Sequence, residues 1–143
     1  MKKVIAVIDH GLGNILSLLN ALDYLRINYR VIKKPTDYIG IYKIIIPGVG
    51  AFPEGMRRLK KSGIDKYIIK KANEHIPILG ICIGMQMLFS KSYEFGECNG
   101  LNLIEGEVVK LKSEINNKNL LIPVVGWKKN ICHKKNINND NFK

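Results

Sequence analysis

The pentapeptide "GICIG", residues 80–84, places Cys82 between two glycines, after a short apolar run and before a segment that predicts a helix. A nucleophile flanked by glycines at this spacing is typical of a strained strand-to-helix turn, which holds the reactive side chain at the edge of a sheet. A position at a helix N-terminus also favours the thiolate form of a cysteine. The pentapeptide is equally compatible with a small buried residue at a tight turn. By itself it leaves both interpretations open.

A second glycine-rich turn, "PGVG" at residues 47–50, follows another apolar run. Gly48 and Gly50 flank Val49, so the backbone there can aim an N–H group at a developing oxyanion, beside the N–H of Ile83. Taken alone, Pro-Gly predicts no more than a strand-ending turn. Next to a nucleophile turn, we favour an oxyanion hole.

The three histidines do not supply a convincing base for Cys82. His10 follows the first predicted strand and is expected to be a polar loop residue, His75 precedes the fourth strand at its amino end, and His133 lies in a polar tail. Cys98 and Cys132 have no spacing typical of a disulfide framework or a zinc site. We therefore predict reduced cysteines, no metal and no cofactor.

Four short apolar runs alternate with helical patterns and predict a mainly parallel α/β sheet with helices on both faces. The strands are expected at 4–8, 29–32, 43–46 and 76–81. The helices are expected at 15–25, after an N-cap at Asn14, at 53–73 with a break near Gly63, and after Gly84, where Met85, Leu88 and Phe89 begin a helical stripe. Sites in such sheets form at the carboxyl ends of the strands, where the turns "DHGLGN", "PGVG" and "GICIG" converge.

The pattern changes after Gly96. The segments "LNLIEGEVVKL" (101–111) and "LLIPVVGW" (120–127) predict strands in a different, antiparallel arrangement. Residues 128–143 have no apolar period and predict a polar loop or tail. We therefore expect a domain over 1–127 that is cut short at its C-terminus.

Composition excludes several classes of protein. The 143 residues contain no apolar run near the roughly 20 residues that span a bilayer, and the basic start leads into a strand rather than a signal peptide. The net charge of +11 comes mostly from scattered lysines, without the basic face or module of a nucleic-acid-binding protein. We expect a cytoplasmic protein that binds neither nucleic acid nor membrane. An acidic partner or an anionic substrate stays open.

Several motifs together resemble the class I (triad) glutamine amidotransferases, and among them the glutaminase subunits of imidazole glycerol phosphate synthase. The resemblance is carried, from the first strand to about Trp127, by "PGVGAF", "GICIGMQMLF", "SYEFG", "GLNLIEGEVVKL" and "IPVVGW". It implies a flavodoxin-like α/β fold. It also implies hydrolysis of L-glutamine to glutamate and ammonia, which passes to a (β/α)8 cyclase subunit. In that heterodimer the ammonia is used to make imidazole glycerol phosphate and an aminoimidazole carboxamide ribonucleotide in histidine biosynthesis.

The resemblance also implies a role for individual residues. Cys82 would be the nucleophile, and Gln86 and Glu94 would bind glutamine. The oxyanion hole would be formed or flanked by Gly48, Val49, Gly50 and Ile83. The cyclase would be faced by Asn14, Trp127 and Lys128.

Two departures from the family pattern define the alternatives. The family's triad histidine and glutamate belong to "HSY"-like and "HPE"-like motifs C-terminal to the matching region, so we expect both to be absent before Lys143. A truncated, inactive fragment that binds glutamine or a partner is therefore one alternative. Lys128 stands where the family has asparagine in "GWN", which suggests a paralogous subunit for amidation of a surface sugar. A different nucleophile-elbow hydrolase is disfavoured by "GMQ" and "PGVG".

Overall fold

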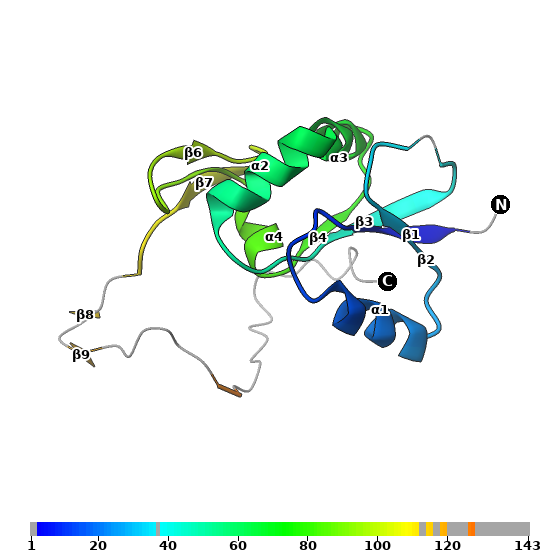
Figure 1. The fold of residues 1–143 in the computed structure, drawn as a ribbon, viewed down its shortest axis with the longest axis horizontal. Coiled ribbons are helices and arrows are strands. Elements are labelled where there is room, and N and C mark those ends of the chain that lie inside the picture. Colours follow the sequence, from blue (N-terminus) through cyan, green and yellow to red (C-terminus); the bar gives the residue numbers. More distant parts are fainter. Residues whose placement is uncertain (1–2, 37, 112–113, 116–117, 120–125, 128–143) are drawn as a thin grey trace, which may run out of the picture. The chain divides into compact units, whose positions relative to one another are not determined.

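The structure, a computed structural model, describes residues 3–36, 38–111, 114–115, 118–119 and 126–127. The chain forms two compact units, Met1–Lys110 and Leu111–Lys143. Nearly all of the described secondary structure belongs to the first unit (Figure 1).

A parallel four-stranded sheet forms the centre of the first unit. Its strands are β1 (Val4–Ile8), β2 (Tyr29–Ile32), β3 (Ile41–Ile46) and β4 (Ile78–Gly80), in the order β2-β1-β3-β4. This order matches the flavodoxin-like class of doubly wound sheets, as the sequence predicts. β1 is buried along its whole length because it lies between two strands and under helices on both faces.

Helix α1 (Ile15–Tyr24) covers one face of this sheet, below it in Figure 1. Asn14 is the N-cap, as predicted, and its side-chain oxygen accepts a hydrogen bond from the Ser17 N–H at 3.2 Å. The apolar stripe of α1 packs with Leu22 against strand residues of that face, Ile5, Val7 and Ile45. The predicted continuation of the stripe to Leu25 is wrong, because Leu25 caps the helix C-terminus and is 61% exposed.

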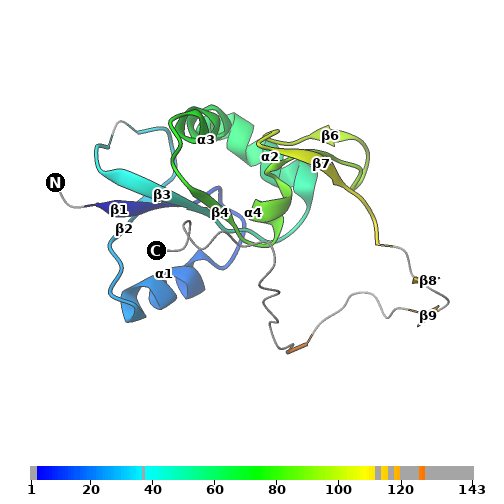
Figure 2. The same ribbon diagram turned by 180° about the vertical axis from the view of Figure 1, so that it is seen from behind.

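Helices α2 (Phe52–Ser62) and α3 (Ile64–Asn73) cover the opposite face, as the view from behind also shows (Figure 2). Gly63 separates them in the left-handed conformation, φ 74°, so the predicted break near Gly63 is confirmed. The large core of this face includes Phe52, Met56 and Leu59 from α2 and Ile64 and Ile68 from α3. This layer places the N-terminus of α2 directly after the turn that ends β3.

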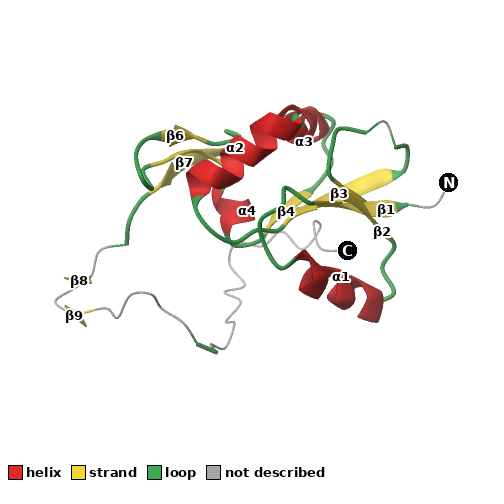
Figure 3. Ribbon diagram, viewed as in Figure 1, coloured by secondary structure: helices red, strands yellow, loops and turns green. Residues whose placement is uncertain are grey.

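The segment after Gly84 differs from the prediction of a longer helix. Helix α4 (Ile83–Gln86) is a single turn, Met87 caps it, and strand β5 (Phe89–Ser92) begins almost at once (Figure 3). Met87 and Leu88 are buried in the core of the α2 face. Phe89 pairs with Ile104 of β7, so the helix-like spacing of apolar residues reflects core packing followed by strand pairing.

The second sheet of this unit has the order β6-β5-β7, with β6 at Cys98–Asn99 and β7 at Ile104–Val108. β5 pairs antiparallel with β6 and parallel with β7. The predicted strand within 101–111 is therefore confirmed, and the sheet is mixed rather than purely antiparallel.

The second unit is described only in part. A short antiparallel pair joins β8 (Glu114–Ile115) to β9 (Lys118–Asn119), and Trp127 is fully exposed. Most of the predicted strand at 120–127 and all of the predicted tail at 128–143 lie outside the described residues. The predicted domain boundary at Trp127 stays a prediction.

Candidate active site

Cys82 lies at the sharp turn between β4 and α4. Its backbone angles are φ 54° and ψ −118°, a conformation that non-glycine residues adopt only under strain. The Cys82 carbonyl accepts hydrogen bonds from the N–H groups of Met85 (3.0 Å) and Gln86 (3.1 Å), which hold the turn in place. Cys82 is a free cysteine and is exposed. Cys82 is therefore not a small buried residue, and its role as a nucleophile stays a prediction.

The two glycines of "GICIG" are required by close backbone packing. A Cβ atom on Gly84 would collide with the carbonyl oxygen of Ile46, and one on Gly80 would collide with the backbone of Met85. The Ile81 N–H donates to the same Ile46 carbonyl at 2.9 Å. The elbow is therefore fixed directly against the end of the buried strand β3.

The three glycine-rich turns converge at the carboxyl ends of the strands, as predicted. A Cβ on Gly48 would collide with the side chain of Ile83, and one on Gly13 would lie 3.2 Å from the Gly48 Cα and 3.4 Å from the Val49 nitrogen. The turns after β1, β3 and β4 thus touch one another. The Val49 side chain is 54% exposed, whereas the Ile83 side chain is buried. The Ile83 N–H belongs to the first turn of α4, where backbone amides lack a hydrogen-bond partner within the helix.

Glu94 connects the second sheet to this site. Its Oε2 atom accepts a hydrogen bond from the Phe52 N–H at 2.8 Å, at the N-terminus of α2, where Ala51 provides no side-chain cap. A carboxylate is favourable at a helix N-terminus because of the partial positive charge there. The buried Ser92 hydroxyl accepts from the Glu94 N–H at 3.1 Å and so orients the residue, a role that the sequence analysis missed.

Gln86 and Glu94 line one cavity. It measures about 560 Å³, and its remaining walls come from the β5–β7 region: Ser92, Tyr93, Phe95, Val108, Val109 and Lys110. Gln86 ends the helical turn that Cys82 caps, although Cys82 itself is not among the residues that line the cavity. The two residues predicted to bind substrate are therefore brought together in a cavity that is large enough for an amino acid.

A larger cavity of about 670 Å³ lies at the opposite end of the sheet. It is bounded by residues before and at the start of β3 and by α3, including Ile39, Lys66 and Lys70. The amino ends of parallel strands are not where such sheets carry their sites. We therefore assign the candidate site to the smaller cavity, which is lined by Gln86 and Glu94.

The histidines fall in unlike places. His75 lies between α3 and β4, at the amino end of that strand, as predicted. His10 lies in the loop after β1, as predicted, but it is buried, 6% exposed, and its ring lies against the turn at Gly48. His133 lies outside the described residues. Within the part of the chain that the structure describes, no histidine is placed to serve Cys82 as a base.

The three residues predicted to face a partner are only partly described. Asn14 is exposed at the start of α1, in the turn that packs on "PGVG", and Trp127 is exposed in the second unit. Lys128 lies outside the described residues. Their role at an interface stays a prediction.

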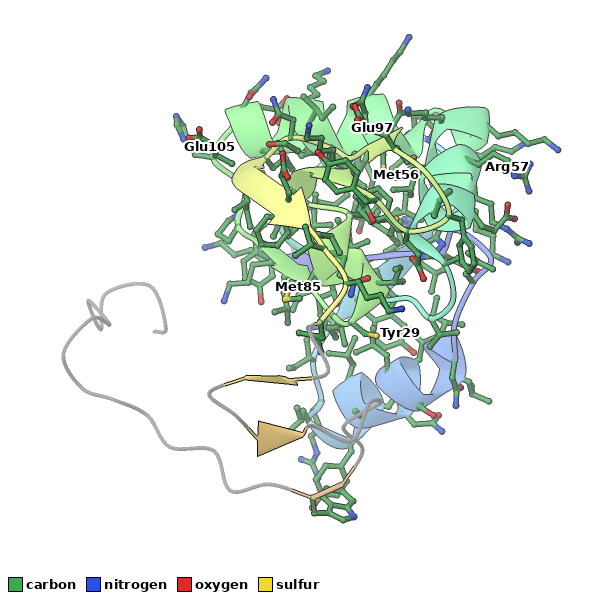
Figure 4. The ribbon with its side chains drawn as sticks, turned by 90° about the vertical axis from the view of Figure 1, so that its left-hand side faces the viewer. Tyr29, Met56, Arg57, Met85, Glu97 and Glu105 are labelled. Carbon is green, nitrogen blue, oxygen red and sulfur yellow. The ribbon has the colours of Figure 1, made fainter. Side chains whose placement is uncertain are left out.

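An ion-pair cluster joins α2 to the turn after β1. Glu54 binds both Arg57 (2.6 Å) and Arg58 (2.7 Å), and the Arg58 Nη1 group donates to the Gly11 carbonyl at 2.9 Å. Arg57 points away from the body of the molecule, whereas Met56 beside it is buried (Figure 4). Hydrogen bonds from Arg57 and then Arg58 lower the pKa of Glu54 from 4.5 to about 2.

We expect acid to weaken the protein through Glu54. Because the pKa of this carboxyl is lower in the folded chain, its contribution to stability is complete above about pH 4.5 and is lost as the pH falls towards 2. Solvent screening keeps the effect small, because the carboxylate is on the surface. In urea unfolding, the stability difference between wild type and Glu54→Gln should shrink between pH 6 and pH 2.5. Glu97→Gln, at an exposed carboxylate without an ion pair among the described residues, is the control; an equal shrinkage there would contradict the assignment.

Two searches of the described residues bear on other classes of site. No group of three or more histidine, cysteine or acidic side chains is arranged there to hold a metal ion. No helix in the same residues has the length and apolar character needed to cross a membrane.

The strained turn at Cys82, the adjoining glycine turn and the parallel sheet together define a doubly wound protein of the α/β class. The sequence profile of the family "Glutamine amidotransferase class-I" matches residues 6–141. The chain belongs to the class-I glutamine amidotransferase family.

Within this family, the chain is similar to curated proteins of one name. The chain is 38% identical over 132 residues to the "Imidazole glycerol phosphate synthase subunit HisH" of Wolinella succinogenes, covering 92% of this chain and 64% of the relative. It is 43% identical over 126 residues to the subunit of the same name from Bacillus licheniformis, covering 87% and 59%. The chain thus spans about 60% of the length of the curated relatives that it matches.

Solved structures support the fold. A crystal structure of a glutamine amidotransferase aligns with a TM-score of 0.64 at 23% identity, over 74% of this chain and 56% of that one. A putative peptidase E protein from Listeria monocytogenes aligns with a TM-score of 0.56 at 17% identity, over 71% and 63%.

Proposed function

We propose that this chain is the glutamine-hydrolysing part of an imidazole glycerol phosphate synthase. The observation that carries the proposal is the strained, exposed Cys82, at an elbow whose Ile83 packs on Gly48 and whose Gln86 lines a cavity together with Glu94. The relatives named HisH support the same assignment.

The proposed reaction begins when the Cys82 thiolate attacks the side-chain carboxamide carbon of glutamine. The carbonyl oxygen gains the negative charge, and in this proposal N–H groups of the Val49 turn and of Ile83 stabilise it. Collapse of the tetrahedral intermediate breaks the carbon–nitrogen bond, and the leaving nitrogen takes a proton to depart as ammonia. Water then hydrolyses the γ-glutamyl thioester to glutamate and restores the thiol.

The described residues include the proposed nucleophile and the proposed oxyanion site, but no proposed group for the proton transfers. The family resemblance implies a triad histidine and glutamate C-terminal to the matched motifs, which would carry the proton from the thiol to the leaving nitrogen. In this proposal Gln86 and Glu94 hold the substrate, with the second oxygen of the Glu94 carboxylate free of the Phe52 amide.

The proposed partner is the cyclase subunit, a (β/α)8 barrel that receives the ammonia. Asn14, Trp127 and Lys128 are the proposed contacts, and the reaction is placed in the cytoplasm, where free thiols such as Cys82 and Cys98 persist. A paralogous subunit for sugar amidation would hydrolyse glutamine in the same way and would differ in the synthase that it binds.

The test is release of glutamate and ammonia from glutamine, measured with and without the cyclase barrel and its nucleotide substrate. We expect hydrolysis that the cyclase stimulates. No hydrolysis above background would favour the inactive binding fragment. Turnover of an ester that glutamine analogues do not block would favour a different hydrolase.

A further inference from the structure

His10 makes one hydrogen bond with its ring, and this bond is to the oxyanion turn. Its Nε2 atom lies 2.7 Å from the carbonyl oxygen of Pro47, the residue that begins "PGVG". A carbonyl oxygen can only accept, so Nε2 must carry the proton and donate. The ring therefore presents its Nε2–H group to the turn, and Nδ1 is its other nitrogen.

The Nδ1 atom of His10 lowers the stability of the folded protein compared with an apolar side chain at this position. It is buried and has no hydrogen-bond partner among the described residues. A buried polar atom without a partner costs free energy that an apolar side chain of similar size would not cost. A histidine kept here at that cost indicates a role for its Nε2–H bond.

The ring also packs directly on the turn that it bonds. A Cβ atom on Gly48 would lie 2.9 Å from the His10 Nε2 and 3.2 Å from Cε1, and it would collide with Ile83 on the other side. Gly48 is thus enclosed between the His10 ring and the residue that follows the nucleophile. A shift of the ring must shift the peptide groups whose N–H is proposed to meet the oxyanion.

We propose that His10 is a positioning residue, which holds the Gly48–Gly50 turn against the elbow through its hydrogen bond to Pro47. This inference deepens the proposed function and rests on it for the catalytic consequence. His10 does not touch the substrate in this proposal. It acts through the backbone of the turn.

Three substitutions of His10 distinguish the effect of its hydrogen bond to Pro47 from the effect of the size of its ring. In His10→Gln the amide nitrogen can take the place of Nε2 and donate to Pro47. In His10→Asn the amide nitrogen takes the place of Nδ1 and falls short of Pro47, and His10→Leu has no donor. With the cyclase present, we expect kcat for glutamine hydrolysis to fall about tenfold or more in the Asn and Leu variants and less than about threefold in Gln, with KM nearly unchanged.

A second measurement needs no turnover. Nitrogen-15 relaxation of the Gly48, Val49 and Gly50 amides should show added conformational exchange in the Asn and Leu variants but not in Gln. If the wild type fails to hydrolyse glutamine and the relaxation follows this pattern, the proposed function is wrong and the positioning role stands. If the Asn and Leu variants keep wild-type relaxation, or if Gln behaves like Leu in either measurement, the positioning role is overturned.

Discussion

In a form of the protein that carries the implied triad histidine and glutamate, replacing Cys82 with alanine is expected to lower kcat for glutamine hydrolysis by about four to six orders of magnitude, while leaving the fold intact. The expected loss is large because removal of the nucleophile of a catalytic triad abolishes the covalent route and leaves only binding and oxyanion stabilisation. The side chain is exposed at the turn, so its removal creates no cavity in the core. Glutamate production in the presence of the cyclase measures the effect.

Cys98 offers a matched control. It is the other free cysteine among the described residues. It is half-buried in β6, packs against the core of the α2 face, and its thiol donates a hydrogen bond to the neighbouring Asn99 carbonyl at 3.8 Å. Cys98→Ala should keep kcat within about threefold of wild type. Hydrolysis that survives Cys82→Ala, or that is lost equally in Cys98→Ala, would remove the assignment of the nucleophile.

The substitution Gly84→Ala is expected to destabilise the protein by about 3 kcal/mol, at the upper end of the cost of overpacking. The added methyl group would meet the backbone carbonyl of Ile46, which belongs to the fully buried end of β3 and cannot move aside like a flexible side chain. Alanine gains about 1 kcal/mol over glycine in helix propensity, which offsets only part of that cost. Urea unfolding measures the stability, and hydrolysis should fall with it, because the elbow itself is displaced.

Gly96→Ala is a control that replaces a glycine with alanine without the collision expected at Gly84. Gly96 has φ 113°, but no atom lies within 4 Å of a Cβ built on it. Only backbone strain opposes alanine there, at a cost of about 1 kcal/mol. Equal losses at the two positions would show that close approach to Ile46 does not determine the choice of glycine at residue 84.

Much of the parallel sheet is predictable from local pattern. Val4–Ile8 and Tyr29–Ile32 are found with the bounds that the sequence predicts, because both are short β-branched runs closed by turn residues. The error after Gly84 has a different origin. The spacing of Met85, Leu88 and Phe89 suits a helix, but β5 pairs there with β6 and β7, and pairing with distant strands overrides local periodicity.

The candidate site also contains some residues that the sequence predicts and others that it does not. Cys82 and its glycines carry a strong local signal, and contacts at Gly48 and Ile83 agree with it. The buried ring of His10 could not be predicted, because nothing near it in the sequence indicates that a residue after β3 will cover it. The Ser92–Glu94–Phe52 connection was missed for the same reason: it depends on how the second sheet meets α2.

The hydrogen bonds that assemble the site have a consequence for folding kinetics. His10 and Pro47 are 37 residues apart in the chain, and Phe52 and Glu94 are 42 apart. Contacts between such distant residues form only after long loops have closed, which makes a chain slow to reach its native state. The helices can form early from local interactions, whereas the Gly48–Gly50 turn meets the elbow only once the parallel strands are in register. A newly made chain would therefore gain its nucleophile geometry among its last steps of folding, well after it has become compact.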